Sequence, residues 1–185
     1  MKQHVLGALF CTCLAATMPA FAGPIVVDAG WYGFCFGEAG SAAYAGGCQG
    51  LGVGETGNPF TFSSPGPVLL KITDAYLKGD SFLVDIDAGS ITFTTPAVAS
   101  GPFGVSDPDQ AFADPSYSHA SIVLGPGSHS VNVFAASSPF GGGGAYLEVE
   151  SAGGVVPEPT SFVLLGAGLM TMALLRRKSL RHGLS

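Results

Sequence analysis

Glycine and proline interrupt this chain so often that no long helix fits into its central part. The 185 residues include 28 glycines and 13 prolines, and both residue types favour turns over regular structure. Between the turns, short segments alternate apolar with polar residues, as strands with one buried face do. These segments are residues 60–62, 68–74, 82–87, 91–94, 121–124, 129–135 and 145–150. The pattern predicts an all-β domain, an antiparallel β-sandwich with a jelly-roll-like arrangement.

One of these segments shows the two faces clearly. Phe82, Val84 and Ile86 point to one side of an extended chain. Asp85 and Asp87 point to the other side. We therefore expect one face to be core and the other to be mostly solvated.

The N-terminus has the pattern of a secretory signal. Lys2 precedes an apolar run over residues 5–16, and an Ala-x-Ala motif ends at Ala22. We expect a signal peptide over residues 1–22, with cleavage before Gly23. The β-sandwich ectodomain is then expected over residues 23–154.

The C-terminal part combines a rigid extended motif with an apolar segment. Pro157 and Pro159 disfavour helical geometry in the residues before them, so Glu158 is held out on an extended chain. Residues 160–175 contain no charged side chain and would measure about 24 Å as a helix. This length predicts a short transmembrane helix for a bilayer core of about 30 Å. A basic cluster that stays in the cytoplasm follows it: Arg176, Arg177 and Lys178.

This order of motifs, over residues 155–181, resembles the PEP-CTERM sorting signal of Gram-negative bacteria. The matching stretches are Val-Pro-Glu-Pro, the apolar run and Arg-Arg-Lys. The resemblance implies that a membrane-embedded exosortase recognises Pro157, Glu158 and Pro159 as substrate residues and processes the precursor in the inner membrane. It also implies that the mature protein reaches the cell surface or the extracellular polysaccharide matrix. An ordinary tail anchor with a proline hinge is the alternative.

The charge of the predicted ectodomain excludes one class of partner. Residues 23–156 carry two lysines and no arginine against twelve acidic residues, a net charge of −10. A domain with so few cations cannot neutralise a run of phosphates, so we expect no nucleic-acid binding.

Two cysteines remain in the ectodomain, Cys35 and Cys48. They flank a segment rich in glycine, alanine and serine, which we expect to be a loop, or one short helical turn near residues 41–44. Because exported proteins enter an oxidising compartment, a disulfide between Cys35 and Cys48 is predicted. A metal site is the alternative, but the four histidines do not cluster near these cysteines in the sequence.

Three acidic residues form a candidate calcium site. Asp107, Asp109 and Asp114 lie around two proline turns, and hard oxygen ligands close in sequence can wrap one Ca²⁺. The spacing is not that of an EF-hand loop. The alternative is that Asp107 caps a helical turn with Pro108 at its first position, while the other two are solvated loop residues. No other cofactor is expected.

The aromatic residues and histidines each allow two interpretations. The rings of Trp31, Tyr32, Tyr117 and Tyr146 are candidate stacking platforms for a carbohydrate, or residues of the core and its rim. For His119 and His129 we expect hydrogen-bonded structural roles.

The sequence contains no nucleophile elbow, zinc-ligand spacing or phosphate-binding loop. The carboxylate pairs Asp85 with Asp87 and Asp107 with Asp109 suit a solvated face better than a glycosidase cleft. We therefore expect a non-enzymatic surface protein with a structural or adhesive role in the extracellular matrix, for instance in a biofilm. The alternatives are a carbohydrate-binding module, calcium-dependent or not, that takes the exopolysaccharide as its partner, and a secreted hydrolase.

Overall fold

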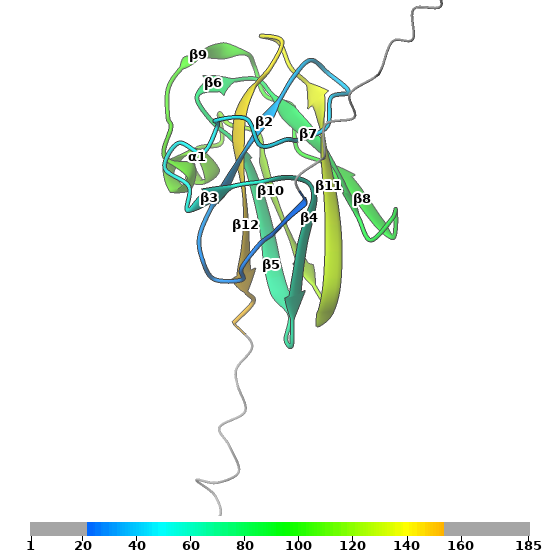
Figure 1. Cartoon of the computed structure of the whole chain (residues 1–185). Coiled ribbons are helices and arrows are strands. Elements are labelled where there is room, and N and C mark those ends of the chain that lie inside the picture. Colours follow the sequence, from blue (N-terminus) through cyan, green and yellow to red (C-terminus); the bar gives the residue numbers. More distant parts are fainter. Residues whose placement is uncertain (1–21, 154–185) are drawn as a thin grey trace, which may run out of the picture.

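The computed structural model describes residues 22–153, and the description below is confined to them. Figure 1 shows two packed sheets with one short helix at the side. The elements in chain order are β1 (Ala22–Pro24), β2 (Tyr32–Phe36), β3 (Gly54–Glu55), β4 (Gly57–Ser64), β5 (Val68–Asp74), β6 (Leu77–Lys78), β7 (Ser81–Ile86), β8 (Ile91–Thr94), β9 (Gly101–Phe103), α1 (Pro108–Ala113), β10 (His119–Leu124), β11 (Gly127–Ser137) and β12 (Gly143–Ser151).

The strands form two five-stranded sheets and a small two-stranded one. The first sheet has the order β1-β4-β11-β7-β8, the second has the order β10-β5-β12-β2-β3, and β6 pairs with β9. From β4 onward the chain crosses repeatedly between the two large sheets. The predicted all-β class is confirmed, and the arrangement is sandwich-like; the jelly-roll variant stays a prediction.

The core lies between the two large sheets. Phe82, Val84 and Ile86 of β7 are fully buried, as their alternation predicted. Val84 pairs in register with Val133 of β11, and this face packs with side chains of the second sheet such as Phe34 in one cluster. Burial of these apolar faces is the main term that stabilises the sandwich.

Two edge pairings depart from a wholly antiparallel sandwich. Strand β1 runs parallel to β4, and β3 runs parallel to β2. A parallel pair needs a long connection between its strands, and residues 37–53 supply it between β2 and β3. Strand β2 therefore lies inside the second sheet, between β12 and β3.

The helix α1 forms where the sequence predicted a single turn. Asp107 is its N-cap, with its side chain accepting the backbone N–H of Gln110 at 3.0 Å. Pro108 occupies the first helical position, where its missing N–H costs no helical hydrogen bond. The predicted capping role of Asp107 is confirmed.

Several predicted segments lie outside the described residues: the signal peptide up to residue 21, the motif at residues 157–159, the transmembrane helix 160–175 and the basic cluster 176–178. Within residues 22–153, no helix has both the length and the apolar character needed to cross a membrane.

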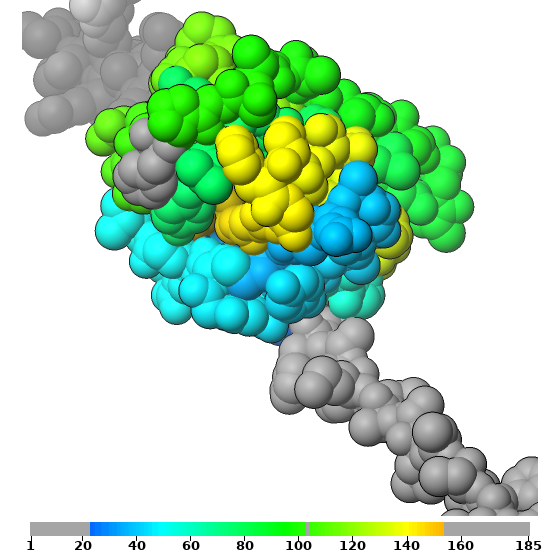
Figure 2. All heavy atoms as spheres, turned by 90° about the horizontal axis from the view of Figure 1, so that it is seen from above, coloured from blue at the N-terminus to red at the C-terminus, as the bar shows by residue number. Residues whose placement is uncertain are grey.

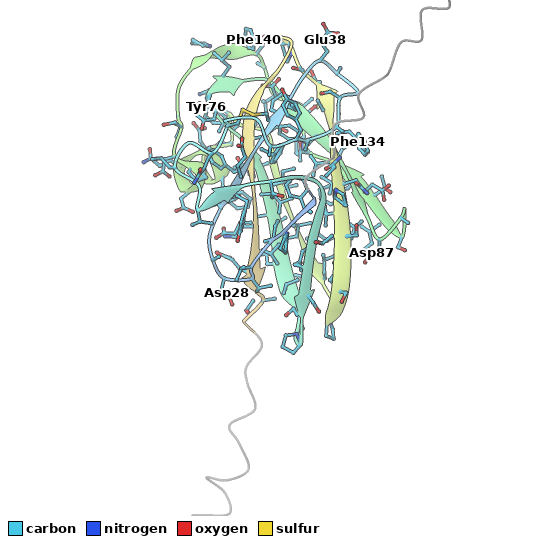
Figure 3. All side chains as sticks on the ribbon, in the orientation of Figure 1. Asp28, Glu38, Tyr76, Asp87, Phe134 and Phe140 are labelled. Carbon is cyan, nitrogen blue, oxygen red and sulfur yellow. A yellow bond between two sulfur atoms is a disulfide. The ribbon has the colours of Figure 1, made fainter. Side chains whose placement is uncertain are left out.

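Strand β12 connects the two ends of the sandwich. It has nine residues and therefore spans about 26 Å. At its last residue, the Ser151 backbone N–H and hydroxyl both donate to Asp28, at 2.7 and 2.6 Å. Figure 3 shows Asp28 at one end of the domain and Glu38 and Phe140 at the other. The chain thus continues toward residue 154 from the end opposite Glu38 and Phe140.

Candidate functional site

A cavity of about 690 Å³ opens near the end of the sandwich that carries Glu38 and Phe140. Its walls come from the end of β2, the loop closed by Cys48, the connection from β5 to β7, and the glycine run 141–144. Figure 2 looks onto this end and shows the yellow segment between the cyan and green ones. Residues from three regions that are distant in sequence, 35–50, 75–80 and 141–144, thus meet at one site.

The disulfide loop forms one wall of the cavity. Cys35 is bonded to Cys48, 13 residues along the chain. Glu55 lies behind the loop and accepts the backbone N–H groups of Gly47, at 2.9 Å, and of Cys48. Burial raises the pKa of Glu55, but these backbone donors and that of Gly46 hold it below its ordinary value. The ionised carboxylate therefore fixes the conformation of this wall.

Of the two forms expected for residues 41–44, the structure has the loop and not the helical turn. Tyr44 instead pairs with Cys35 as an isolated bridge, and Ala42 pairs with Phe134. The bridges bond Tyr44 N–H to the Cys35 carbonyl at 2.9 Å and Ala43 N–H to the Val133 carbonyl at 2.9 Å. The loop satisfies its backbone groups against neighbouring strands, which removes the need for a helix.

Glycines are required where the walls come close together. A Cβ on Gly144 would lie 3.0 Å from the Tyr76 ring and 3.1 Å from Cys48 Cβ. At Gly50, where φ is +52°, a Cβ would meet the hydroxyls of Tyr76 and Tyr146 at 2.0 Å. These contacts explain why the loops around the cavity are dense in glycine.

A buried carboxylate, Asp80, lines the cavity. It is 2% exposed, and its Oδ1 has no hydrogen-bond partner among the described residues. The buried hydroxyl of Ser138 lies beside the Asp80 carboxyl in poor hydrogen-bond geometry and lowers its pKa. Burial outweighs this effect and raises the pKa of Asp80 to about 6. Buried polar atoms without a partner are rare and point to a ligand, an ion or water.

A second buried acid, Asp74, stands close to Asp80. Its side chain accepts the backbone N–H of Ala75 at 2.8 Å and of Gly79 at 3.3 Å. Burial, followed by the charge of Asp80, raises the pKa of Asp74 to about 8, against the opposing effect of these donors. At neutral pH the pair therefore holds a proton on Asp74 and leaves the charge on Asp80.

This pair predicts that the domain loses stability as the pH rises. The folded protein keeps a proton on Asp74 between the unfolded pKa of 3.8 and the folded pKa of about 8, so the folded state binds more protons than the unfolded state. The free energy of unfolding should then fall through this window. Thermal melts at pH 5 and pH 8 measure it, and Asp74→Asn should flatten the decline while the exposed control Glu38→Gln keeps it. Equal melting temperatures at the two pH values would contradict this prediction.

The structure corrects the interpretation of the aromatic residues as stacking platforms. Trp31, Tyr117 and Tyr146 are 5%, 1% and 0% exposed, so no carbohydrate can stack on them. Trp31 donates its indole N–H to Asp109 at 2.8 Å. Tyr32 is half-buried, and its hydroxyl accepts a backbone N–H at 3.1 Å. The alternative interpretation, core and rim, is confirmed for the three buried rings.

The predicted calcium ligands are not brought together. Asp107 caps α1 through Gln110, and Asp109 accepts the Trp31 indole N–H. Asp114 accepts the backbone N–H and the hydroxyl of a serine two residues further on, at 2.8 and 2.7 Å. Within residues 22–153, the three carboxylates form no common group of potential ligand atoms. Calcium binding stays a prediction without geometric support here.

One group of potential metal ligands does occur in the described chain: Cys35, Cys48 and Glu55. Both sulfur atoms are used in the disulfide, and a metal requires free thiolates. This group is therefore a covalent crosslink beside a carboxylate and does not bind metal in this state.

The two histidines have hydrogen-bonded structural positions, as expected. His119 Nδ1 lies 2.9 Å from the Tyr117 carbonyl. His129 Nδ1 lies 2.8 Å from Asp87, and Nε2 lies 3.0 Å from the Gly125 carbonyl. Burial lowers the pKa of His129, but these two acceptors raise it above its ordinary value. The Asp87 carboxylate is thus hydrogen-bonded to His129 at the sheet surface, and the two form an ion pair when the imidazole is protonated.

Sequence reasoning missed a charged cluster beside α1. Lys71 lies 3.0 Å from Glu148 and 2.7 Å from Glu150. Its ammonium group also sits 5.4 Å from the centre of the Trp31 ring and 5.5 Å from that of Phe112. Lys71 in β5 and Glu148 in β12 are paired residues in the sheet. A prediction of which strands pair, and in which register, would have found this contact.

Comparison with known proteins identifies the C-terminal segment. Residues 155–178 match the family model described as the PEP-CTERM protein-sorting motif. The chain carries this motif. The match includes Pro157, Glu158 and Pro159 and extends to Arg176, Arg177 and Lys178.

The PEP-CTERM motif supports an exported protein that is sorted by an exosortase, with a membrane-anchored precursor. No curated protein matches the chain. The PEP-CTERM match covers the C-terminal segment, and the cavity described above belongs to the sandwich that precedes it.

Proposed function

We propose that this protein is a non-enzymatic surface or matrix component whose sandwich domain presents a binding cavity away from the membrane. The observation that supports it is the course of β12. This strand begins at the cavity with Gly143 and ends at Ser151 on the opposite end of the domain, and the PEP-CTERM motif follows four residues later.

The position of the motif supports one orientation of the domain. A precursor held through residues 155–178, or a mature protein attached near residue 157, is joined at the end marked by Asp28 and Ser151. The cavity then lies about 26 Å further from the attachment point, the length of β12. An adhesive role needs its binding end exposed in this way, and the excess of acidic residues helps to keep the presented domain soluble.

A substitution in the sorting motif tests the proposal. Glu158→Ala should leave the domain folded, because the residue follows the sandwich, but should leave the precursor almost entirely unprocessed. Intact mass of the protein recovered from the outer surface of the host measures this. Wild-type protein should start at Gly23 and end near Pro157, whereas the variant should retain residues 160–185.

The matched control is Glu38→Ala, which removes an exposed acid at the cavity end of the domain and should be processed as the wild type is. Normal maturation of Glu158→Ala would count against sorting through this motif. A wild-type mass that still includes residues 160–185 would indicate a simple tail-anchored protein.

The alternatives differ in what they do to polysaccharide. A carbohydrate-binding module should be depleted from solution by insoluble polysaccharide, and a hydrolase should release soluble sugar from it. A purely structural component should do neither when it is added alone.

A further inference from the structure

Among the described residues, the cavity lining carries negative charge and no positive charge. Asp80 is the only carboxylate among the described residues that line it, and no lysine, arginine or histidine is among them. The two lysines of the described chain are paired elsewhere, Lys71 with Glu148 and Glu150 and Lys78 with Asp114 at 3.8 Å. The protein thus supplies an acid to this cavity without a cation to balance it.

The hydrogen bonding of Asp80 is also incomplete. Oδ1 is buried and meets no donor in good hydrogen-bond geometry among the described residues; the neighbouring Ser138 hydroxyl lowers the carboxyl pKa but does not offset the effect of burial. A buried acceptor that is poorly satisfied is destabilising. A ligand that donates hydrogen bonds to the Asp80 carboxylate from the cavity would complete its hydrogen bonding. A ligand that is also positively charged would hold Asp80 in its ionised form.

The size and the aromatic lining restrict the ligand further. A volume of about 690 Å³ is in the range of sites for small organic molecules and is much too large for a bare metal ion with its short coordination distances. The rings of Tyr44 and Tyr76 also line the cavity, and Tyr44 is 50% exposed. Aromatic faces attract ammonium groups.

From these observations we propose that the cavity binds an organic ligand through a primary ammonium group, with Asp80 as its counter-ion. This inference rests on the proposed function, in which the cavity lies at the outward-facing end of the domain. It adds the chemical class of the ligand that binds there. Two sources can supply the group: an amino sugar in a polysaccharide, or an alkyl amine such as a lysine side chain.

The test is calorimetric titration of the full chain, purified in detergent, with two matched pairs of probes. Glucosamine is compared with N-acetylglucosamine, and cadaverine with pentanediol. We expect one amine or both to bind more tightly than the neutral partner, by about tenfold or more. This ratio corresponds to the free energy of about one charge-assisted hydrogen bond. Tighter binding of glucosamine would identify an amino sugar as the source, and tighter binding of cadaverine an alkyl amine.

Variants locate the binding. Asp80→Asn should lower the affinity for the amine by about tenfold or more. Glu38→Gln removes the same charge from the same end of the domain and should leave the affinity unchanged. Should Asp80→Asn not fold, as judged by circular dichroism, Tyr44→Ala at the exposed rim serves instead, with a loss of about two- to fivefold expected.

The proposal is overturned if neither amine binds, or if the neutral partners bind as tightly as the amines. It is also overturned if Asp80→Asn, or Tyr44→Ala where that variant is used instead, leaves the affinity for the amine unchanged. Intact mass of the surface protein reports on sorting independently. Normal processing combined with a failed amine titration would remove this inference and leave the proposed function in place.

Discussion

Replacing Lys71 with methionine should lower the free energy of unfolding by about 3–5 kcal/mol, the typical cost of removing one partner from a buried ion pair. Lys71 and Glu148 have side chains that are 14% and 9% exposed. Without the lysine, the Glu148 carboxylate stays buried with no opposite charge beside it. The contacts of the ammonium group with the Trp31 and Phe112 rings are lost at the same time.

Chemical denaturation followed by circular dichroism measures this effect. The informative control is the double variant Lys71→Met with Glu148→Leu, since replacing both partners by apolar groups is often neutral. We expect the double variant to recover most of the lost stability. A single variant within about 1 kcal/mol of wild type would mean that the pair behaves like an exposed one.

Removal of the disulfide should have the next largest effect. The double variant Cys35→Ala with Cys48→Ala frees a loop with a sequence separation of 13, and a crosslink over such a loop contributes about 3 kcal/mol in the chain-entropy model. For a domain of this size the melting temperature should fall by about 10 °C. Because the loop is a wall of the cavity, amine binding should weaken as well.

A comparison with Glu55→Gln separates the crosslink from the hydrogen bonds behind it. This variant keeps the disulfide but weakens the acceptor of the Gly47 and Cys48 backbone N–H groups, so we expect a smaller loss, of about 1 kcal/mol. If the cysteine variant melted at the wild-type temperature, the loop would be held by its noncovalent contacts, the backbone bridges to residue 35 and Val133 and the hydrogen bonds to Glu55.

Local sequence was sufficient to predict much of the sandwich. Period-two alternation depends only on which side chains prefer burial, so β5 and β8 begin and end at the predicted residues 68–74 and 91–94. Asp107 followed by Pro108 predicted the start of α1 in the same way, since capping involves residues only three positions apart. The PEP-CTERM motif is also linear in sequence, and residues 155–178 match its family model.

The cavity required the tertiary structure. Asp74 and Asp80 are unremarkable in sequence, and their raised pKa values follow from burial, which depends on how the loops around residues 44–50 and 141–144 pack. Trp31 gave an ambiguous signal because an aromatic ring suits a binding surface and a core equally well. Its contact with Asp109, 78 residues away, decided the matter. The sequence alone thus determined the strands, the charge and the sorting motif, whose causes are local, whereas packing between distant segments decided which acids are buried and where the cavity lies.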